Sequence, residues 1–354
     1  MACALLVLGA CRTAPEEQAA AQAVTQATTA AAASAQAPAE MLCMRGEACR
    51  TQFPLKNGLK LAVYRNLPLE KKNISIKRAV VVLHGSSRTA HRYFARATDA
   101  AREVKLDQET LVIAPRFSNA KDDPPRRLAG DLFWDKDKHW KRGDLSTTSM
   151  KQRIGSFAAM DELLSFLGAS KNFPNLKKIT VIGHSAGGQF IQRYVAGHST
   201  LPALAGIHIR HVSANPGRYT YLNDMRPTPA FDGTFARPRD IAACPRYNLY
   251  EYGIEKLNAY MQASGKAALI RRIRKRDFVL LLGDQDTDPE GKGLPRNCRA
   301  MMQGRQRLER GLMFKAHLDR YFAPHRVRVV IMPGVSHSGT KLFKSPEARE
   351  VIFY

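Results

Sequence analysis

The middle of the chain contains a strand-like pattern that passes through a tight turn into a helix-like pattern. Residues 179–182 (Ile-Thr-Val-Ile) are β-branched or apolar, and apolar residues recur at helical spacing in 189–195. Between them, residues 183–187 (Gly-His-Ser-Ala-Gly) match G-x-S-x-G. A serine on such a turn has strained backbone angles, and only small residues at the two ends of the pattern let strand and helix approach closely. The pattern predicts that the Ser185 hydroxyl is exposed beside a helix N-terminus, which favours negative charge.

Three further strand-like runs each end in polar or small residues. Residues 78–83 lead into a His-Gly-Ser loop at 84–86. Residues 277–283 lead into a loop with three aspartates, and residues 326–332 lead into a loop that contains His337. A serine becomes a useful nucleophile when a base accepts its proton and a third group orients that base. The chain therefore offers a serine, an acid and a histidine, each placed directly after a strand.

The order of these signals resembles that of the α/β-hydrolase superfamily, and the resemblance extends over about residues 53–354. It implies that Ser185 is the nucleophile and that His337 takes its proton and later gives it to the leaving group. It also implies an oxyanion hole formed by the backbone N–H groups of Ala186, directly after the nucleophile, and Ser86. Within this superfamily the chain resembles the serine esterases, and the N-terminal features described below resemble those of secreted lipoproteins.

The resemblance also indicates which acid would orient the histidine. In this superfamily the acid often follows a strand as G-x-x-D, and from Gly283 this spacing selects Asp286. The first alternative is Asp284, and Asp288 is a more distant one. Whichever carboxylate it is, its role would be to hold the imidazole of His337 in the correct tautomer.

The other histidines fit structural roles better than catalytic ones. His84 is expected to brace the 84–86 loop by hydrogen bonding, and His184 is interpreted as packing or as a wall of the cleft. His208 and His211 lie three residues apart in a strand-like run, which places them on opposite faces. Neither a zinc-binding spacing, nor a phosphate-binding P-loop, nor a dinucleotide-binding glycine pattern after a strand occurs in the sequence. No cofactor is expected.

Strand and helix patterns alternate along the chain. This alternation is typical of an α/β fold with a mainly parallel central sheet that is covered by helices on both faces. In addition to the runs above, it predicts strands over 59–64, 110–115 and 207–212 and helices over 91–104 and 149–167.

Two segments after strands are too long to be simple turns. Residues 117–149 and 215–276 are interpreted as loop and cap elements above the cleft, and the cap-like insertion covers about 216–276 of a domain that spans 41–354. Aromatic side chains in these segments are expected either to stack on a substrate or to pack the cap onto the core; the packing role is favoured for most of them. These aromatic residues are Trp134, Trp140, Tyr219, Tyr221, Phe231, Phe235, Tyr247, Tyr250 and Tyr252.

The N-terminus resembles an export signal. Residues 1–11 are apolar but too short to span a bilayer, which takes about 20 apolar residues. Residues 8–11 (Leu-Gly-Ala-Cys) resemble a lipobox, which would make Cys11 a lipidated N-terminus, although no positive charge precedes it and the true start codon stays open. The alternative is a plain signal peptide. Residues 12–40 are rich in Ala, Gln and Thr and are predicted to be a disordered tether. The expected location is across the inner membrane, anchored by lipid and facing the periplasm or the cell exterior.

Four cysteines lie outside the signal, and an even number fits disulfides in an oxidising compartment. Three pairings are possible. Proximity in sequence favours Cys43 with Cys49, which leaves Cys244 with Cys298. Free structural thiols are the alternative.

The chain is strongly basic. It has 55 Lys and Arg against 31 Asp and Glu, a formal net charge of +24. A dense run at 266–276 has apolar residues at the spacing of a helix that packs on the domain with its basic side outward. No nucleic-acid-binding signature accompanies the charge, so no nucleic-acid partner is expected. A solvated surface is the favoured interpretation, and an anionic envelope surface or an acidic substrate is the alternative.

Taken together, the sequence predicts a serine hydrolase that cleaves a small-molecule or polymeric carboxylic ester through an acyl-enzyme. One alternative is an amidase or peptidase with the same three residues. Another is a non-catalytic, anchored binding module for anionic envelope polymers. The oligomeric state is left open.

Overall fold

A mainly parallel sheet forms the centre of the computed structural model, which describes residues 1–2, 42–119, 122, 128–135, 139–148, 152–199 and 201–354. Its eight strands lie in the order β1-β2-β4-β3-β7-β8-β11-β12, and only the pairings β1–β2 and β2–β4 are antiparallel. Because β3, β7, β8 and β11 run parallel, the loops at their carboxyl ends meet at one edge. The strands are β1 (Arg50–Pro54), β2 (Lys60–Arg65), β3 (Arg78–Leu83), β4 (Thr110–Pro115), β7 (Lys178–His184), β8 (His208–Ala214), β11 (Asp277–Gly283) and β12 (Val327–Met332).

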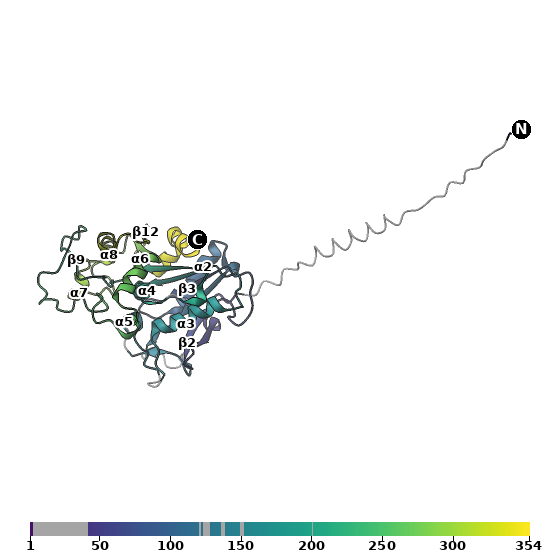
Figure 1. Ribbon diagram of the computed structural model, residues 1–354, viewed down its shortest axis with the longest axis horizontal. Helices are drawn as coiled ribbons and strands as arrows, with labels where there is room; N and C mark the ends of the chain where they lie inside the picture. The colour runs from purple at the N-terminus through teal and green to yellow at the C-terminus, as the bar shows by residue number, and fades with distance from the viewer. Residues whose placement is uncertain (3–41, 120–121, 123–127, 136–138, 149–151, 200) are drawn as a thin grey trace. The chain divides into compact units, whose positions relative to one another are not determined.

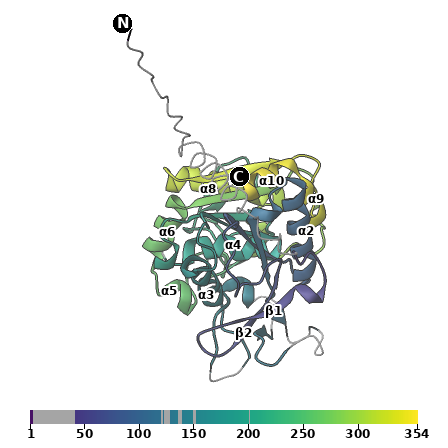
Figure 2. The same cartoon turned by 90° about the vertical axis from the view of Figure 1, so that its right-hand side faces the viewer.

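Helices cover both faces of this sheet (Figures 1 and 2). Successive residues of a strand point to opposite faces, so Val80 and Val82 of β3 belong to one apolar cluster and Val81 and Leu83 to the other. This is why the strands are apolar almost throughout. On the first face pack α2 (Ala90–Glu103), α9 (Gly339–Lys344) and α10 (Pro346–Phe353), and on the second α3 (Ser156–Ala169), α4 (Ala186–Gly197), α6 (Lys266–Lys275) and α8 (Arg307–Phe322).

The predicted fold class is therefore confirmed, and every predicted strand is present within about two residues of its expected bounds. The predicted helix over 149–167 begins later, at Ser156, after Gly155 in extended backbone. The sequence analysis missed β1. This edge strand carries three half-exposed residues before the buried Phe53, so it has no continuous apolar run, and its pairing with β2 defines it.

The insertion after β8 packs against the domain through its aromatic side chains. Tyr219, Tyr221 and Tyr252 are fully buried, and the ring of Tyr219 stacks on Phe314 of α8 with centroids 4.6 Å apart. These rings hold the insertion on the core, so they are not available to stack on a substrate. The insertion contains α6 together with the short elements β9 (Arg226–Pro227), β10 (Phe235–Ala236) and α5 (Ala259–Gln262).

The earlier insertion, after β4, shows the same use of aromatic residues. Trp134 and Trp140 are fully buried, and Phe117 stacks on Trp140 with centroids 5.4 Å apart and ring planes 8° apart. The insertion includes the two-residue strands β5 (Ser118–Asn119) and β6 (Phe133–Trp134), which pair in parallel.

Two disulfides confirm the favoured pairing. Cys43 and Cys49 are joined with Cα atoms 5.5 Å apart, and Cys244 and Cys298 with Cα atoms 5.9 Å apart. The second bridge ties the insertion after β8 to α7 (Cys298–Met301), in the segment that follows β11.

Leu42–Tyr354 forms one compact unit. The predicted signal segment, the tether and Cys11 lie outside the described residues. Among the residues that are described, no helix is both long and apolar enough to cross a membrane.

Candidate active site

Ser185 lies at the point where β7 turns into α4. Its backbone has φ 57° and ψ −110°, a conformation that non-glycine residues rarely adopt, and its N–H donates to the carbonyl of Ala214 at 2.8 Å. The turn leaves no room for side chains at either end of the pattern. A Cβ on Gly183 would lie 2.3 Å from the carbonyl group of Gly187, and a Cβ on Gly187 would lie 2.8 Å from the carbonyl oxygen of His84. The strained serine is thus held by close backbone packing, as the sequence pattern predicts.

Three polar side chains form a continuous hydrogen-bonded line at this turn. The Oγ of Ser185 lies 3.0 Å from Nε2 of His337, and Nδ1 of His337 lies 2.7 Å from Oδ2 of Asp286. An ionised carboxylate only accepts hydrogen bonds, so Nδ1 carries the ring proton and Nε2 accepts the hydrogen bond of the serine hydroxyl. Asp286 is buried, whereas Ser185 and His337 are partly exposed. The line therefore runs from a buried carboxylate to an accessible hydroxyl.

The structure brings one of the three candidate aspartates to His337. The Oδ1 of Asp284 accepts the backbone N–H of Gly334 at 2.8 Å, which braces the turn after β12. The Oδ1 of Asp288 accepts the backbone N–H of Glu290 at 2.8 Å in an exposed loop. Both alternatives therefore stabilise loops, and Asp286 alone of the three contacts the imidazole.

A buried arginine holds the second oxygen of Asp286. Nη1 of Arg307 lies 3.3 Å from Oδ1 of Asp286, and Nη2 donates to the carbonyl of Lys292 at 2.9 Å. Burial lowers the pKa of Arg307, and the neighbouring Asp286 opposes that shift. The sequence analysis missed Arg307. It is one of many arginines, and only the packing of α8 against the loop after β11 distinguishes it.

His84 braces the loop after β3, as expected. Its Nε2 accepts the backbone N–H of Phe117 at 3.0 Å, so Nδ1 donates to the carbonyl of Gly85 at 2.8 Å. Burial lowers the pKa of His84 to about 4, so the ring is neutral at pH 7. Ser86 is exposed in this loop and Ala186 is the first residue of α4, where helix N–H groups lack intrahelical acceptors. Their role as an oxyanion hole stays a prediction.

His184 forms a wall behind His337. The two rings have centroids 4.8 Å apart and planes 34° apart, and Nδ1 of His184 lies 2.8 Å from the hydroxyl of Tyr93. Burial, followed by the influence of His337, lowers the pKa of His184 well below its usual value. The packing role agrees with the sequence interpretation, but no sequence signal pointed to Tyr93, which lies 91 residues away on α2.

The remaining histidines do not form a metal site. His211 is buried and faces His198, with Nε2 atoms 3.0 Å apart, while His208 on the opposite face of β8 pairs with Asp277. Within the described part of the chain, no group of three or more His, Cys, Asp or Glu side chains is arranged to hold a metal ion.

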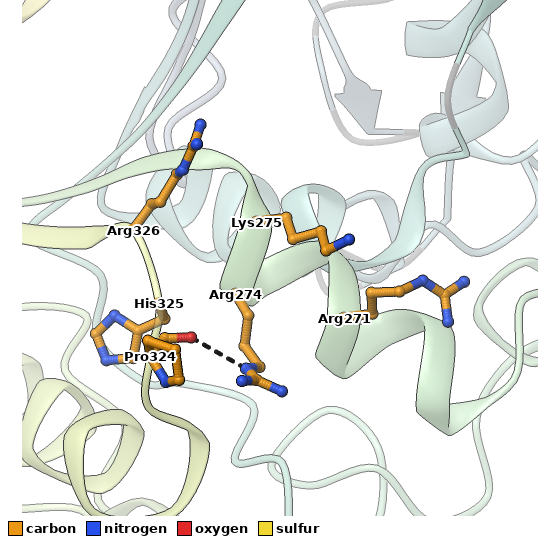
Figure 3. A pocket seen from close by; sticks show the side chains of 6 residues that line it. All are labelled: Arg271, Arg274, Lys275, Pro324, His325 and Arg326. Atoms are coloured by element: carbon orange, nitrogen blue, oxygen red, sulfur yellow. Dashed lines mark hydrogen bonds between the residues drawn. The ribbon is translucent and has the colours of Figure 1, made fainter.

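Several hollows in the described part of the chain lie apart from the Ser185 site, and two of them differ in character. The larger, of about 820 Å³, is lined mainly by apolar residues, among them Phe231 of the insertion after β8 and Met302 directly after α7, and by the Cys244–Cys298 bridge. The smaller, of about 360 Å³, is basic and lies where α6 and the residue before β12 approach each other (Figure 3). Neither lining includes Ser185 or His337.

Comparisons of the sequence with family models and with curated proteins found no match. The structure is similar to that of LpqC, a poly(3-hydroxybutyrate) depolymerase from Bordetella parapertussis, with a TM-score of 0.58 and 20% identity over 87% of this chain and 94% of that one. It is also similar to poly(aspartic acid) hydrolase-1 from Sphingomonas sp. KT-1, with a TM-score of 0.58 and 22% identity over 88% of this chain and 100% of that one. At these identities the similarity establishes the fold.

Proposed function

We propose that this chain, which has the α/β-hydrolase fold, is a serine hydrolase that cleaves carboxylic esters through an acyl-enzyme. The observation that carries the proposal is the hydrogen-bonded line from Asp286 through His337 to Ser185. A hydroxyl is a weak nucleophile until a base takes its proton, and this line supplies the base and the group that orients it. The proposal is further supported by two similar solved structures, those of a depolymerase and a hydrolase.

The geometry suggests how the proposed reaction would proceed. Nε2 of His337 takes the proton of Ser185 as Oγ attacks the ester carbonyl, and the negative charge on the carbonyl oxygen is stabilised by backbone N–H groups. The predicted donors are those of Ala186 and Ser86. His337 then gives its proton to the departing alcohol, which leaves an acyl group on Ser185. A water molecule, deprotonated by His337, releases the acid and restores the serine.

Amide cleavage is the second candidate. The same three residues can release an amine if the imidazolium protonates the leaving nitrogen, and one of the similar structures is that of a poly(aspartic acid) hydrolase. The net charge of +24 would favour an anionic polymer at the surface of this chain. Ester and amide substrates must therefore be tested side by side.

The test uses the full chain with p-nitrophenyl acetate, butyrate and octanoate, a panel of aminoacyl p-nitroanilides and a fluorophosphonate probe. We expect ester turnover and labelling in the wild type, and loss of both in Ser185→Ala. Ser199→Ala, an exposed serine just after α4, is the matched control and should behave as the wild type. Anilide turnover without ester turnover would move the assignment to an amidase. A folded protein that is neither labelled nor active would refute the enzyme and favour the binding module.

We also propose that the protein is exported and anchored through Cys11. The two disulfides support an oxidising compartment, because such bridges are rare in reducing ones. The test is metabolic labelling with a radioactive fatty acid in bacterial cells. Label in the wild type that is lost in Cys11→Ser supports the anchor, whereas processing without label indicates a plain signal peptide.

A further inference from the structure

One buried hydroxyl lies close to three segments of the candidate active site. Tyr93 lies on α2, and its Oη is 2.8 Å from Nδ1 of His184, the residue before the nucleophile. A Cβ built on Gly85, in the predicted oxyanion loop, would lie 3.1 Å from the same oxygen. A Cβ built on Gly339, two residues after His337, would lie 3.2 Å from it. The glycines at these two positions let the loop after β3 and the first residue of α9 lie close to the hydroxyl.

The pKa of the Tyr93 phenol indicates the direction of its hydrogen bond with His184. Burial raises the pKa of Tyr93, while Arg96 and a hydrogen bond with the Gly85 backbone oppose that shift. The backbone of Gly85 lies against this oxygen, since its Cβ position is 3.1 Å from Oη. The raised pKa keeps the phenol protonated, and Nδ1 of His184, 2.8 Å away, is placed to accept its hydrogen. The other nitrogen of His184, Nε2, then carries the ring proton.

His184, whose ring is held by the Tyr93 hydroxyl, in turn packs against His337. Its ring packs against the imidazole of His337 and is kept neutral, since burial lowers its pKa. A neutral ring adds no repulsion when His337 becomes positively charged during a proton transfer. Nε2 of His184 is buried and has no hydrogen-bond partner among the described residues, an unfavourable arrangement that an apolar side chain would avoid. An apolar side chain would, however, leave the Tyr93 hydroxyl without its acceptor.

We propose that Tyr93 is a positioning residue that sets the oxyanion loop relative to the nucleophile and the base. The inference rests on the proposed hydrolase function. Through Gly85 the hydroxyl sets the position of the loop that carries Ser86, and through His184 it sets the ring plane of His337. The oxyanion donors and the base must be correctly placed in the same transition state, and small displacements of either are costly in rate. A single side chain on α2 therefore fixes the oxyanion loop and the catalytic base relative to each other, although the two lie on different loops.

The direct test is Tyr93→Phe, which removes only the hydroxyl. We expect kcat for p-nitrophenyl butyrate to fall about 10- to 100-fold with KM changed less than about twofold. Affinity for a boronic acid, which forms a tetrahedral adduct with a serine and uses the oxyanion hole, should fall by a similar factor. Tyr64→Phe is the matched control. Tyr64 is also buried and its hydroxyl donates to Glu47 at 2.9 Å, away from the site.

A second pair of variants addresses the other end of the same hydrogen bond. His184→Asn retains a side-chain acceptor near the position of Nδ1, whereas His184→Leu retains the bulk without an acceptor. We expect the asparagine variant to keep clearly more activity than the leucine variant, with the same ranking in boronic acid affinity. This pair keeps the inference testable if Tyr93→Phe does not fold.

The outcomes separate this inference from the proposed function. A wild type that the fluorophosphonate does not label refutes the hydrolase, and the inference with it. A labelled wild type with Tyr93→Phe as active as Tyr64→Phe refutes the inference alone. A fall in kcat with unchanged boronic acid affinity also refutes it, because the hydroxyl would then act elsewhere than on the oxyanion loop.

Discussion

The two edges of the parallel sheet hold polar side chains in different ways. At the carboxyl edge, Ser185, His337 and Asp286 are joined to one another, and Arg307 and Tyr93 support them from α8 and α2. At the amino edge, α6 ends and β12 begins around a basic hollow lined by four cationic side chains (Figure 3). These are Arg271, Arg274, Lys275 and Arg326.

The side chains at the amino edge have few partners. Arg274 donates to the backbone carbonyl of Pro324 at 3.1 Å. The side chains of Arg271, Lys275 and Arg326 have no hydrogen bond or ion pair with any other residue that the structure describes, and Figure 3 shows their charged ends pointing in different directions. Water screens these charges, so nothing forces them into one arrangement. The comparison teaches that burial, more than the number of charged groups, gives a cluster a defined geometry.

The largest effect expected at the carboxyl edge, after loss of the nucleophile, comes from the acid. In Asp286→Asn the amide would donate to Nδ1 of His337 and leave the ring in the wrong tautomer, so kcat should fall about 10,000-fold. Asp284→Asn is the control, since its amide oxygen can still accept from Gly334 and activity should stay within about threefold. Steady-state kinetics with p-nitrophenyl butyrate measures both. Equal losses in the two variants would contradict the assignment of Asp286.

Removing the cation behind the acid should have the next largest effect. Arg307→Met leaves the buried carboxylate of Asp286 without its ion pair, which should lower the free energy of unfolding by about 3 kcal/mol and reduce kcat about 10-fold. Urea unfolding followed by circular dichroism gives the first quantity. An unchanged free energy of unfolding would mean that the carboxylate of Asp286 does not depend on its ion pair. The carboxyl edge would then resemble the solvent-exposed amino edge more than its burial indicates.

His317 on α8 tests what burial does to the pKa of a polar side chain. Neither of its ring nitrogens has a hydrogen-bond partner in the part of the chain that the structure describes, and burial, with a smaller contribution from Arg226, lowers its pKa to about 3. As the pH falls below 6.5 the unfolded chain binds a proton that the folded chain excludes, so stability is lost between about pH 6.5 and 3.

His317→Leu removes this proton uptake. The variant should therefore gain stability relative to the wild type by about 1–2 kcal/mol between pH 7 and pH 5. Urea unfolding at the two pH values measures the gain. A difference between the two proteins that stays constant with pH would show that His317 does not titrate in this way.

The smallest effect is expected at the amino edge. The double variant Arg271→Ala with Lys275→Ala removes two exposed charges, so the unfolding midpoint should not change measurably and ester turnover should stay within about twofold. Lys72→Ala with Lys177→Ala, two exposed lysines elsewhere, gives the same loss of charge. A loss of ester turnover in Arg271→Ala with Lys275→Ala, but not in the control double variant, would show that the basic hollow is coupled to the carboxyl edge.

Much of the candidate site could be predicted because its main residues follow local patterns. The turn at Ser185 needs small neighbours, and β7 and α4 have clear apolar periodicity, so short-range sterics identify the nucleophile. His337 and the aspartates follow strands, which also have local signals. The edge strand β1 was not predicted, because its half-exposed residues show no apolar run. Only its pairing with β2 defines it as a strand.

The sequence by itself determined which residues could stand at the carboxyl ends of the strands, because strand length, apolar pattern and tight turns depend on near neighbours. The resemblance favoured Asp286 among the three aspartates, but only the tertiary structure decided its contact with His337 and which side chains support the line. Asp286, Arg307 and Tyr93 come from segments whose proximity is set by strand order and by helix packing across the sheet. The energy of a buried hydrogen bond depends on that packing, and no periodicity along the chain encodes it.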